Sequence, residues 1–322
     1  MIDQIKKPIE DDFRLYEDAF NAALSTDNTL LAHILKYVSS TKGKELRPIL
    51  VLLSASILGK VNSVTIQAAV SLELLHTASL MHDDVVDQTY QRRSKYSVNA
   101  LWNNKTAILV GDFYLSKSAL ISAKTENIKI TTLLADLGCA LSEGELLQLS
   151  NESKLIIDEP AYLRVIKKKT AETFAFCTQA GAISLNATSQ QEEQLRLFGE
   201  YLGMIFQIKD DIFDYFDSDD IGKPTGNDLK EGKMTLPLIY ALGKADKNES
   251  KPILNMIRNK DFTVENLKNM SLFVKERGGI QYAESRMKEY KRMAIDILSS
   301  LADSPSKDSL LRCLDFAMLR SK

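Results

Sequence analysis

Apolar residues recur along most of the chain at the three- and four-residue spacing of amphipathic helices. Segments with the strict apolar–polar alternation of a half-buried strand are absent from the sequence. The pattern therefore predicts an all-α protein, a helical bundle with a central cavity. The predicted helices cover residues 5–23, 30–38, 48–59, 65–87, 99–123, 129–150, 161–185, 198–206, 234–242, 252–259, 263–277 and 279–301.

The predicted helix 65–87 is apolar until its last turns, where it ends in three carboxylates. On a helix, Asp83 and Asp87 lie one turn apart on a single face, and Asp84 lies beside them. Unpaired charges at the mouth of an apolar interior are costly. A divalent cation removes that cost, and carboxylate oxygens suit Mg²⁺, which shares its remaining positions with water and substrate phosphates.

The same pattern occurs again after the apolar segment 198–206. Gln207, Asp210, Asp211 and Asp214 follow it at positions i, i+3, i+4 and i+7, which places all four on one helix face. One such cluster is weak evidence, because 26% of the residues are charged and a solvated helix face produces it often. Two clusters, each ending an apolar helix and followed by a basic segment, predict two carboxylate groups that face a metal-bound polyanion.

Basic residues gather near the first acidic cluster. Lys44 and Arg47 lie just before the predicted helix 48–59. The free backbone N–H groups at the start of a helix also favour anions. A solvated basic turn is an equally good interpretation of that pair. Arg92 and Arg93 follow the carboxylates and could pair with them, but guanidinium groups are also standard partners of phosphate oxygens. We favour phosphate.

Two further basic segments lie beside predicted helices. Lys169 and Thr170 interrupt an apolar helix face and could present an ammonium and a hydroxyl group inward, whereas Lys167–Lys168 fits a solvated turn better. Lys223 and Lys233 lie in a polar, glycine-containing segment after the second acidic cluster. Its composition predicts a mobile loop that closes over phosphates.

Composition narrows the class of protein. The 322 residues show no Pro/Ser-rich linker, which predicts one domain over 1–322, and a net charge of −2 gives no reason to expect nucleic acid. Cys139, Cys177 and Cys313 lack metal-ligand spacing and fit buried thiols in a reducing compartment. The first twenty residues lack a signal-peptide core, and apolar runs such as 49–53 are too short to span a bilayer. We therefore expect a cytoplasmic protein without stable membrane insertion.

These motifs together resemble those of the trans-isoprenyl (polyprenyl) diphosphate synthases, and within that family the long-chain type such as octaprenyl diphosphate synthases. The resemblance runs from about residue 43 to residue 298. Its motifs are Gly43–Pro48, Asp83–Asp87 with Arg92 and Arg93, Lys169 with Thr170, Phe206–Asp214, and Gly222–Lys233. It implies the isoprenoid synthase helical bundle with a deep cavity, a homodimer, and three Mg²⁺ ions that bridge both acidic motifs to an allylic diphosphate.

The resemblance also implies roles for single residues. The principal Mg²⁺ ligands would be Asp83, Asp87 and Asp210, and the further or water-mediated ligands Asp84, Asp211 and Asp214. The cations that neutralise the leaving diphosphate would be Arg92, Lys169, Lys223 and Lys233. The dipoles that support the allylic cation would come from Lys169, Thr170 and Gln207. Isopentenyl diphosphate would bind Lys44, Arg47, His76 and Arg93, although spacing alone favours a core histidine at position 76.

Product length is predicted from the helix of the first motif. In this family the growing chain runs along that helix away from the metals, and bulky residues about one turn before the first aspartate form a floor. Here Ala78 and Ser79 are small, which predicts a long product, and the floor lies deeper. The first motif also lacks the two-residue insertion common in bacterial short-chain enzymes. Ser94 replaces the usual glycine after the arginine pair, which affects only the local turn.

Three alternatives remain at this point. A short-chain synthase making farnesyl or geranylgeranyl diphosphate is disfavoured by Ala78 and Ser79. A terpene cyclase should carry an Asn/Ser/Glu-type second motif instead of 210–214. A non-catalytic partner subunit of a synthase should have lost an acidic motif or the basic loop. The prediction is an active enzyme whose product serves as a quinone side-chain precursor.

Overall fold

The computed structural model describes residues 1–40, 43–92, 95–216, 227–230 and 232–320, without the side chains of residues 227 and 228. Helices form nearly all of its regular structure, so the predicted all-α class is confirmed. The strands β1 (Gln91–Arg92) and β2 (Lys95–Tyr96) pair antiparallel. The chain divides into two compact units: unit 1 is Met1–Gly138, Phe176–Arg196 and Leu301–Leu310, and unit 2 is Cys139–Ala175, Leu197–Ser300 and Leu311–Lys322. The single domain over 1–322 stays a prediction.

The elements follow the chain in order. Those wholly in unit 1 are α1 (Ile2–Lys6), η1 (Lys7–Ile9), α2 (Glu10–Ala23), α3 (Thr29–Ser39), α4 (Leu46–Ser56), α5 (Ser63–Val86), β1, β2, α6 (Val98–Leu101) and α7 (Asn104–Ala123). Those wholly in unit 2 are α9 (Glu159–Ile166), the π-helical turn η2 (Lys167–Ala171), α13 (Asn227–Lys230), α14 (Leu236–Lys244), α15 (Lys247–Arg258), α16 (Val264–Glu276) and α17 (Gly279–Ser299). Those with residues in both are α8 (Ile128–Lys154), α10 (Glu172–Ser184), α11 (Ser189–Phe213) and α18 (Pro305–Leu319).

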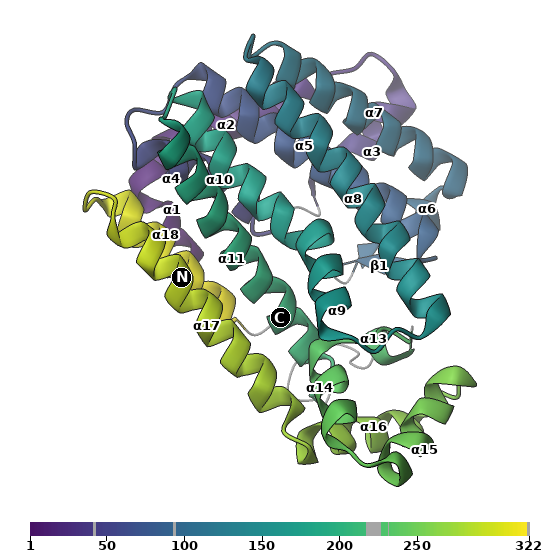
Figure 1. Ribbon diagram of the computed structural model, residues 1–322. Coiled ribbons are helices and arrows are strands. Elements are labelled where there is room, and N and C mark those ends of the chain that lie inside the picture. The colour runs from purple at the N-terminus through teal and green to yellow at the C-terminus, as the bar shows by residue number, and fades with distance from the viewer. Residues whose placement is uncertain (41–42, 93–94, 217–226, 231, 321–322) are drawn as a thin grey trace. The chain divides into compact units, whose positions relative to one another are not determined.

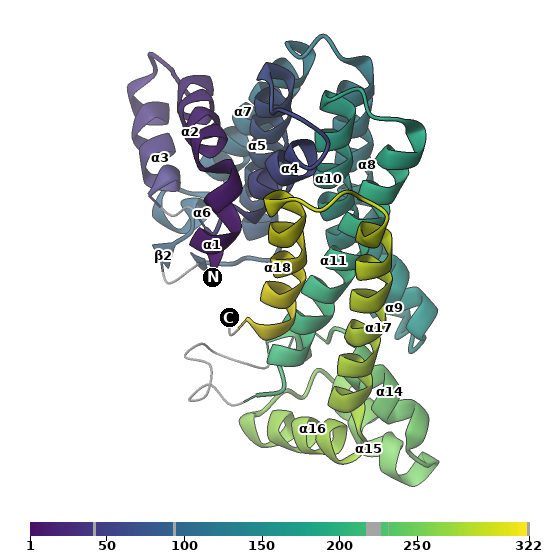
Figure 2. The same ribbon diagram turned by 90° about the vertical axis from the view of Figure 1, so that its left-hand side faces the viewer.

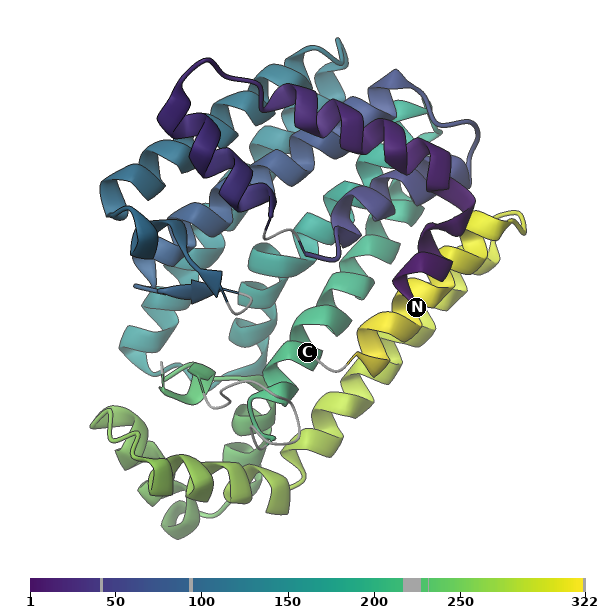
Figure 3. The same ribbon diagram turned by 180° about the vertical axis from the view of Figure 1, so that it is seen from behind.

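The core of unit 1 is built around α5. The helix begins with a capping box, in which the Asn62 side chain accepts a hydrogen bond from the backbone N–H of Thr65 at 3.0 Å. It runs side by side with α7 (Figure 1), and Ser118 of α7 donates a hydrogen bond to the carbonyl oxygen of Ser71 at 2.7 Å. The purple N-terminal helix α2 lies across α4 and α5 on the other side (Figure 3). These contacts hold α5, whose last turn carries the first acidic motif, within the core of unit 1.

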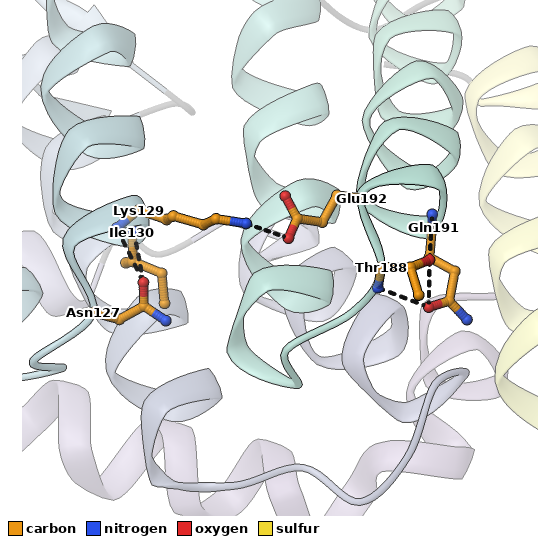
Figure 4. Close-up of polar contacts among 6 residues, drawn as sticks. All are labelled: Asn127, Lys129, Ile130, Thr188, Gln191 and Glu192. Atoms are coloured by element: carbon orange, nitrogen blue, oxygen red, sulfur yellow. Dashed lines mark hydrogen bonds and ion pairs between the residues drawn. The ribbon is translucent and has the colours of Figure 1, made fainter.

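Unit 1 also contains the starts of α8 and α11, and side chains define both (Figure 4). Asn127 caps α8 by accepting a hydrogen bond from the backbone N–H of Lys129 at 3.1 Å. Gln191 and Thr188 cap α11 reciprocally, because the Gln191 side chain accepts from the Thr188 N–H and the Thr188 hydroxyl accepts from the Gln191 N–H. Lys129 and Glu192 then form an ion pair of 2.8 Å that joins the two starts.

The length and composition of α5 alone would let it cross a bilayer. In the structure, 56% of its most apolar window is buried, and α2, α4 and α7 pack against it. A core helix passes the same test of length and hydropathy. The apolar length of α5 is therefore accounted for by the core of unit 1.

In unit 2, two helices pack closely against the π-helical turn η2. Two glycines let neighbouring helices approach it closely: a Cβ atom on Gly203 of α11 would lie 2.5 Å from the Cα of Ala171, and one on Gly144 of α8 would lie 3.1 Å from the backbone nitrogen of Lys169. A π-turn widens the helix locally and is often found at functional sites. Elsewhere in unit 2, α14 packs on α16 and α17 (Figure 2).

Candidate active site

The first acidic motif occupies the last turn of α5 in unit 1. Asp83 is half-buried and Asp87, the residue after the helix, is exposed. Asp84 differs, because only 3% of its surface is exposed. Asp83 and Asp87 are therefore the members of this motif that solvent and ligands can reach more easily.

Asp84 is held by several groups of unit 1. Arg92 of β1 donates a hydrogen bond from Nε to Asp84 Oδ1 at 2.9 Å, and its Nη2 forms an ion pair with the same oxygen at 2.8 Å. The Asp84 carbonyl oxygen accepts from the Thr89 N–H at 2.9 Å and from the Asn99 side chain at 3.1 Å. Arg92 thus pairs with an acid, which is the alternative that the sequence left open beside phosphate binding, and the pair ties the segment after α5 to the motif.

A cavity of about 70 Å³ in unit 1 brings three of the predicted site residues together. His76, Asp84 and Arg92 all line it. Lys44 is exposed and Arg47, in the first turn of α4, is half-buried, but neither lines this cavity. Arg93 lies outside the described residues, so its predicted role stays a prediction.

The two predicted chain-length residues lie on α5 with different surroundings. Ala78 is only 2% exposed, so its small side chain is packed inside unit 1. Ser79 is half-buried and donates its hydroxyl to the carbonyl oxygen of His76 at 2.9 Å, within its own helix. Leu74 and Leu75, one turn earlier, are buried.

In unit 2, a chain of hydrogen bonds joins three predicted site residues. Thr170 of η2 donates its hydroxyl to Gln207 Oε1 at 2.7 Å. Gln207 donates from Nε2 to Asp211 Oδ1 at 2.8 Å. Tyr162 of α9 donates its hydroxyl to the other oxygen, Asp211 Oδ2, at 2.6 Å. The second acidic motif is therefore connected to the η2 turn through the Gln207 amide.

Lys169, also in η2, is held by the adjacent helix α8. Its ammonium lies 2.5 Å from Glu145 Oε2 and donates to Gln148 Oε1 at 2.8 Å. Lys167 and Lys168 pair with Glu200 and Glu143, and their own side chains are half-buried. Lys169 lines a cavity of unit 2 and its two neighbours do not, but its predicted catalytic role stays a prediction.

The other carboxylates of the second motif also meet protein donors. Asp210 Oδ1 lies 2.7 Å from Nη2 of Arg320, which follows α18. Asp214 is buried and accepts a hydrogen bond from the backbone N–H of Leu229 at 3.0 Å. Among the described residues, no three His, Cys, Asp or Glu side chains form a ready metal cage.

A second cavity, of about 240 Å³, lies in unit 2. Its lining contains five predicted site residues together with Tyr162: Lys169, Thr170, Gln207, Asp211 and Lys233. Glu152 also lines it, and burial raises the pKa of this carboxyl, although the Gln148 amide and the nearby Lys233 and Lys169 oppose the rise. Lys223, predicted to act with Lys233, lies outside the part of the chain that the structure describes.

Comparison with known proteins identifies the family. A family model described as polyprenyl synthetase matches residues 28–272. An octaprenyl diphosphate synthase from Haemophilus influenzae is 36% identical over 96% of this chain and 94% of its own length. The chain belongs to the polyprenyl synthetase family.

Solved structures support the same assignment. The geranylgeranyl pyrophosphate synthase from Bacteroides thetaiotaomicron is 42% identical, covers 99% of each chain and superposes with a TM-score of 0.86. The polyprenyl synthase from Caulobacter crescentus, solved with calcium and isoprenyl diphosphate, is 29% identical over 100% of this chain and 98% of its own, with a TM-score of 0.93. This polyprenyl synthetase is therefore a prenyltransferase with the isoprenoid synthase fold, and the fold and family expected from the sequence motifs are confirmed.

Four residues around the synthetase site are absent from the sequence prediction. Glu145 and Gln148 hold Lys169, and their i, i+3 spacing on an apolar helix is a signal that a search for polar stripes could have found. Tyr162 precedes Lys169 by two helical turns. Arg320 lies more than a hundred residues from Asp210, and nothing local in the sequence connects the two.

Proposed function

We propose that this synthetase condenses isopentenyl diphosphate with an allylic diphosphate and releases a long-chain all-trans polyprenyl diphosphate, a quinone side-chain precursor. The observation that carries the proposal is the cavity of unit 2. An ammonium, a hydroxyl, an amide oxygen and one carboxylate of the second acidic motif line it together, in Lys169, Thr170, Gln207 and Asp211. These groups suit a substrate that develops negative charge at one end and a carbocation at the other.

Mg²⁺ fits the donor chemistry of both acidic motifs. Asp83, Asp87 and Asp210 provide hard oxygen donors on partly exposed side chains. Mg²⁺ is usually bound by one or two carboxylates together with water and substrate phosphates, and a preformed cage is not needed. Three bound Mg²⁺ ions would supply positive charge to the leaving diphosphate.

The chain's own residues then act on the two ends of the substrate. Lys169 and Lys233, in the same cavity, stabilise negative charge on the diphosphate oxygens as the C–O bond ionises. Glu145 and Gln148 keep the Lys169 ammonium in place. The Gln207 amide oxygen faces the developing allylic cation, and the apolar part of the cavity excludes water.

Isopentenyl diphosphate binds through cations of unit 1. Lys44, Arg47, Arg93 and His76 provide its diphosphate site, and its double bond adds to the allylic cation. The resulting cation loses a proton to the released diphosphate, so no protein base is required. Arg92 orients Asp84 and contributes positive charge to the allylic diphosphate.

Product length follows from the small side chains of Ala78 and Ser79. One helical turn advances about 5.4 Å, comparable to one extended isoprene unit. Small residues one turn before Asp83 therefore leave room for whole additional units. The octaprenyl name of the Haemophilus relative supports a long product.

A short-chain synthase is the second candidate. The 42% identical Bacteroides structure bears the name geranylgeranyl pyrophosphate synthase, which favours a twenty-carbon product. The two candidates share one reaction and differ in where elongation stops. Product analysis separates them directly.

A homodimer in the cytoplasm is the proposed working form. The face of α7 opposite α5 exposes Ile108, Leu109, Leu115 and Leu120, an apolar stripe that a second copy of the chain would cover. Cys177 and Cys313 are buried free thiols, which suits a reducing compartment, whereas Cys139 is exposed and its expected burial is wrong.

The test incubates the purified protein with farnesyl diphosphate, labelled isopentenyl diphosphate and Mg²⁺, and sizes the dephosphorylated products. Ala78→Tyr is compared with Ala22→Tyr, which places the same side chain on an exposed position of α2. Wild type and Ala22→Tyr should give products well beyond twenty carbons, and Ala78→Tyr should shorten them. Ser79→Tyr repeats the test at a half-buried position in case Ala78→Tyr does not fold.

Other outcomes favour the alternatives. A twenty-carbon product in all variants would support the short-chain synthase. No incorporation by the wild type would support a non-catalytic partner subunit.

A further inference from the structure

Asp211 differs from Asp210, although the two are adjacent in the second acidic motif. Asp211 is only 4% exposed, whereas the side chain of Asp210 is 35% exposed. Each carboxylate oxygen of Asp211 accepts a hydrogen bond from a neutral side chain, Oδ1 from Gln207 and Oδ2 from Tyr162. Such an arrangement suits a carboxylate that orients other groups.

The Asp211 carboxylate determines which way the Gln207 amide points. An ionised carboxylate only accepts hydrogen bonds, so the NH₂ group of Gln207 must face it. The amide oxygen then faces the opposite way, where it accepts the Thr170 hydroxyl at 2.7 Å. The negative end of the amide dipole is thereby directed to the side of η2, and both residues line the 240 Å³ cavity.

Tyr162 is well placed to hold Asp211 in turn. It is a buried residue of α9, a helix capped by Asp158, whose carboxylate accepts from the Ala161 N–H at 3.0 Å. The helix α9 continues directly into η2, which carries Thr170. The ends of the chain Tyr162–Asp211–Gln207–Thr170 therefore belong to one continuous helical segment, which makes the network rigid.

We propose that Asp211 and Tyr162 are positioning residues that fix the Gln207 amide with its oxygen toward the allylic cation, and that Asp211 is not a metal ligand. The inference rests on the proposed function, because it assigns a partner to the cation of that reaction. If the amide turned over, its NH₂ group would face the cation, and the transition state would lose stabilisation.

The experiment compares Asp211→Asn, Tyr162→Phe, Asp210→Asn and the control Tyr282→Phe. Tyr282 also donates its hydroxyl to a carboxylate of α9, Glu159 at 2.8 Å, but lies outside the cavity lining. Four quantities are measured: kcat and KM for farnesyl diphosphate, the Kd for Mg²⁺ by calorimetry with inorganic pyrophosphate present, and the melting temperature. Metal binding is thus read without turnover.

We expect Asp211→Asn to lower kcat about 100-fold and Tyr162→Phe about tenfold, with KM and the Mg²⁺ Kd little changed. An asparagine at 211 presents an NH₂ group of its own and cannot accept from both partners. Asp210→Asn should weaken Mg²⁺ binding by more than about tenfold. Tyr282→Phe should match the wild type in kcat, KM and Mg²⁺ Kd, and should lose only a little melting temperature.

Two results would overturn the inference while the proposed function stands. One is a loss of Mg²⁺ affinity in Asp211→Asn as large as in Asp210→Asn, which would make Asp211 a metal ligand. The other is wild-type kcat in folded Tyr162→Phe. If the wild-type protein did not incorporate isopentenyl diphosphate at all, the proposed function itself would be overturned. The wild-type reaction alone distinguishes this outcome from the other two.

Discussion

Replacement of Arg320 by glutamine should destabilise unit 2 and make it more responsive to Mg²⁺. The Arg320 side chain is 9% exposed, pairs with Asp210 at 2.7 Å and donates to the carbonyl oxygen of Phe206 at 2.7 Å. Its guanidinium carbon also lies 3.6 Å from the centre of the Phe206 ring. The substitution removes the charge and most of the stacking at once.

The size of the effect follows from these contacts. Loss of one partner of a fully buried ion pair costs about 3–5 kcal/mol. Because Asp210 is 35% exposed, water can solvate its carboxylate after the arginine is removed. We therefore reduce this contribution to about 2 kcal/mol. The backbone hydrogen bond and the stacking add about 1 kcal/mol. The free energy of unfolding should therefore fall by about 3 kcal/mol, which corresponds to a loss of roughly 4 °C in melting temperature.

The assay is thermal unfolding with and without excess Mg²⁺ and inorganic pyrophosphate. Arg312→Gln serves as the matched control, because Arg312 lies exposed on α18, the helix that Arg320 directly follows. If Asp210 binds Mg²⁺ as proposed, the Arg320 guanidinium competes with the metal, so Mg²⁺ should raise the melting temperature of Arg320→Gln more than that of the wild type. An unchanged melting temperature, or a smaller response to Mg²⁺ than in the wild type, would refute this reasoning.

Three further changes test other contacts. Glu145→Gln should lower kcat about tenfold, because the Lys169 ammonium loses a charged partner at 2.5 Å; an unchanged kcat would count against that role. Arg92→Gln should lower the free energy of unfolding by about 2 kcal/mol in urea titrations, because Asp84 is buried while Arg92 is partly exposed. Burial raises the pKa of Glu152 in the folded state, so ionisation destabilises the fold as pH rises above the unfolded pKa of about 4.3. Glu152→Gln should therefore melt at a higher temperature than the wild type near neutral pH, but not in acid. A difference in melting temperature that does not depend on pH would contradict this prediction.

Apolar periodicity and capping residues in the sequence predict several of the helices correctly. The helix predicted over residues 65–87 is α5, Ser63–Val86, since the apolar period and the Asn62 capping box agree. The predicted helix 99–123 is divided into α6 and α7, because Asn103 caps a new helix by accepting from the Thr106 N–H. The helix α18 was missed although Pro305 marks its start.

Long-range packing explains what the sequence does not reveal about the site. The predicted helix 161–185 contains the π-turn η2, where Gly144 and Gly203 allow close approach from two other helices. The spacing of the aspartates predicts both acidic motifs. It does not predict which aspartates accept hydrogen bonds from protein groups, because Tyr162 and Arg320 come from separate parts of the chain.

The most direct test of the proposed function is incorporation of labelled isopentenyl diphosphate onto farnesyl diphosphate by the wild type and by Asp83→Asn and Asp210→Asn. The proposal predicts Mg²⁺-dependent formation of a polyprenyl product by the wild type and a severe loss of incorporation in each variant, one from each acidic motif. Undiminished incorporation in either variant, or none in the wild type, would contradict it.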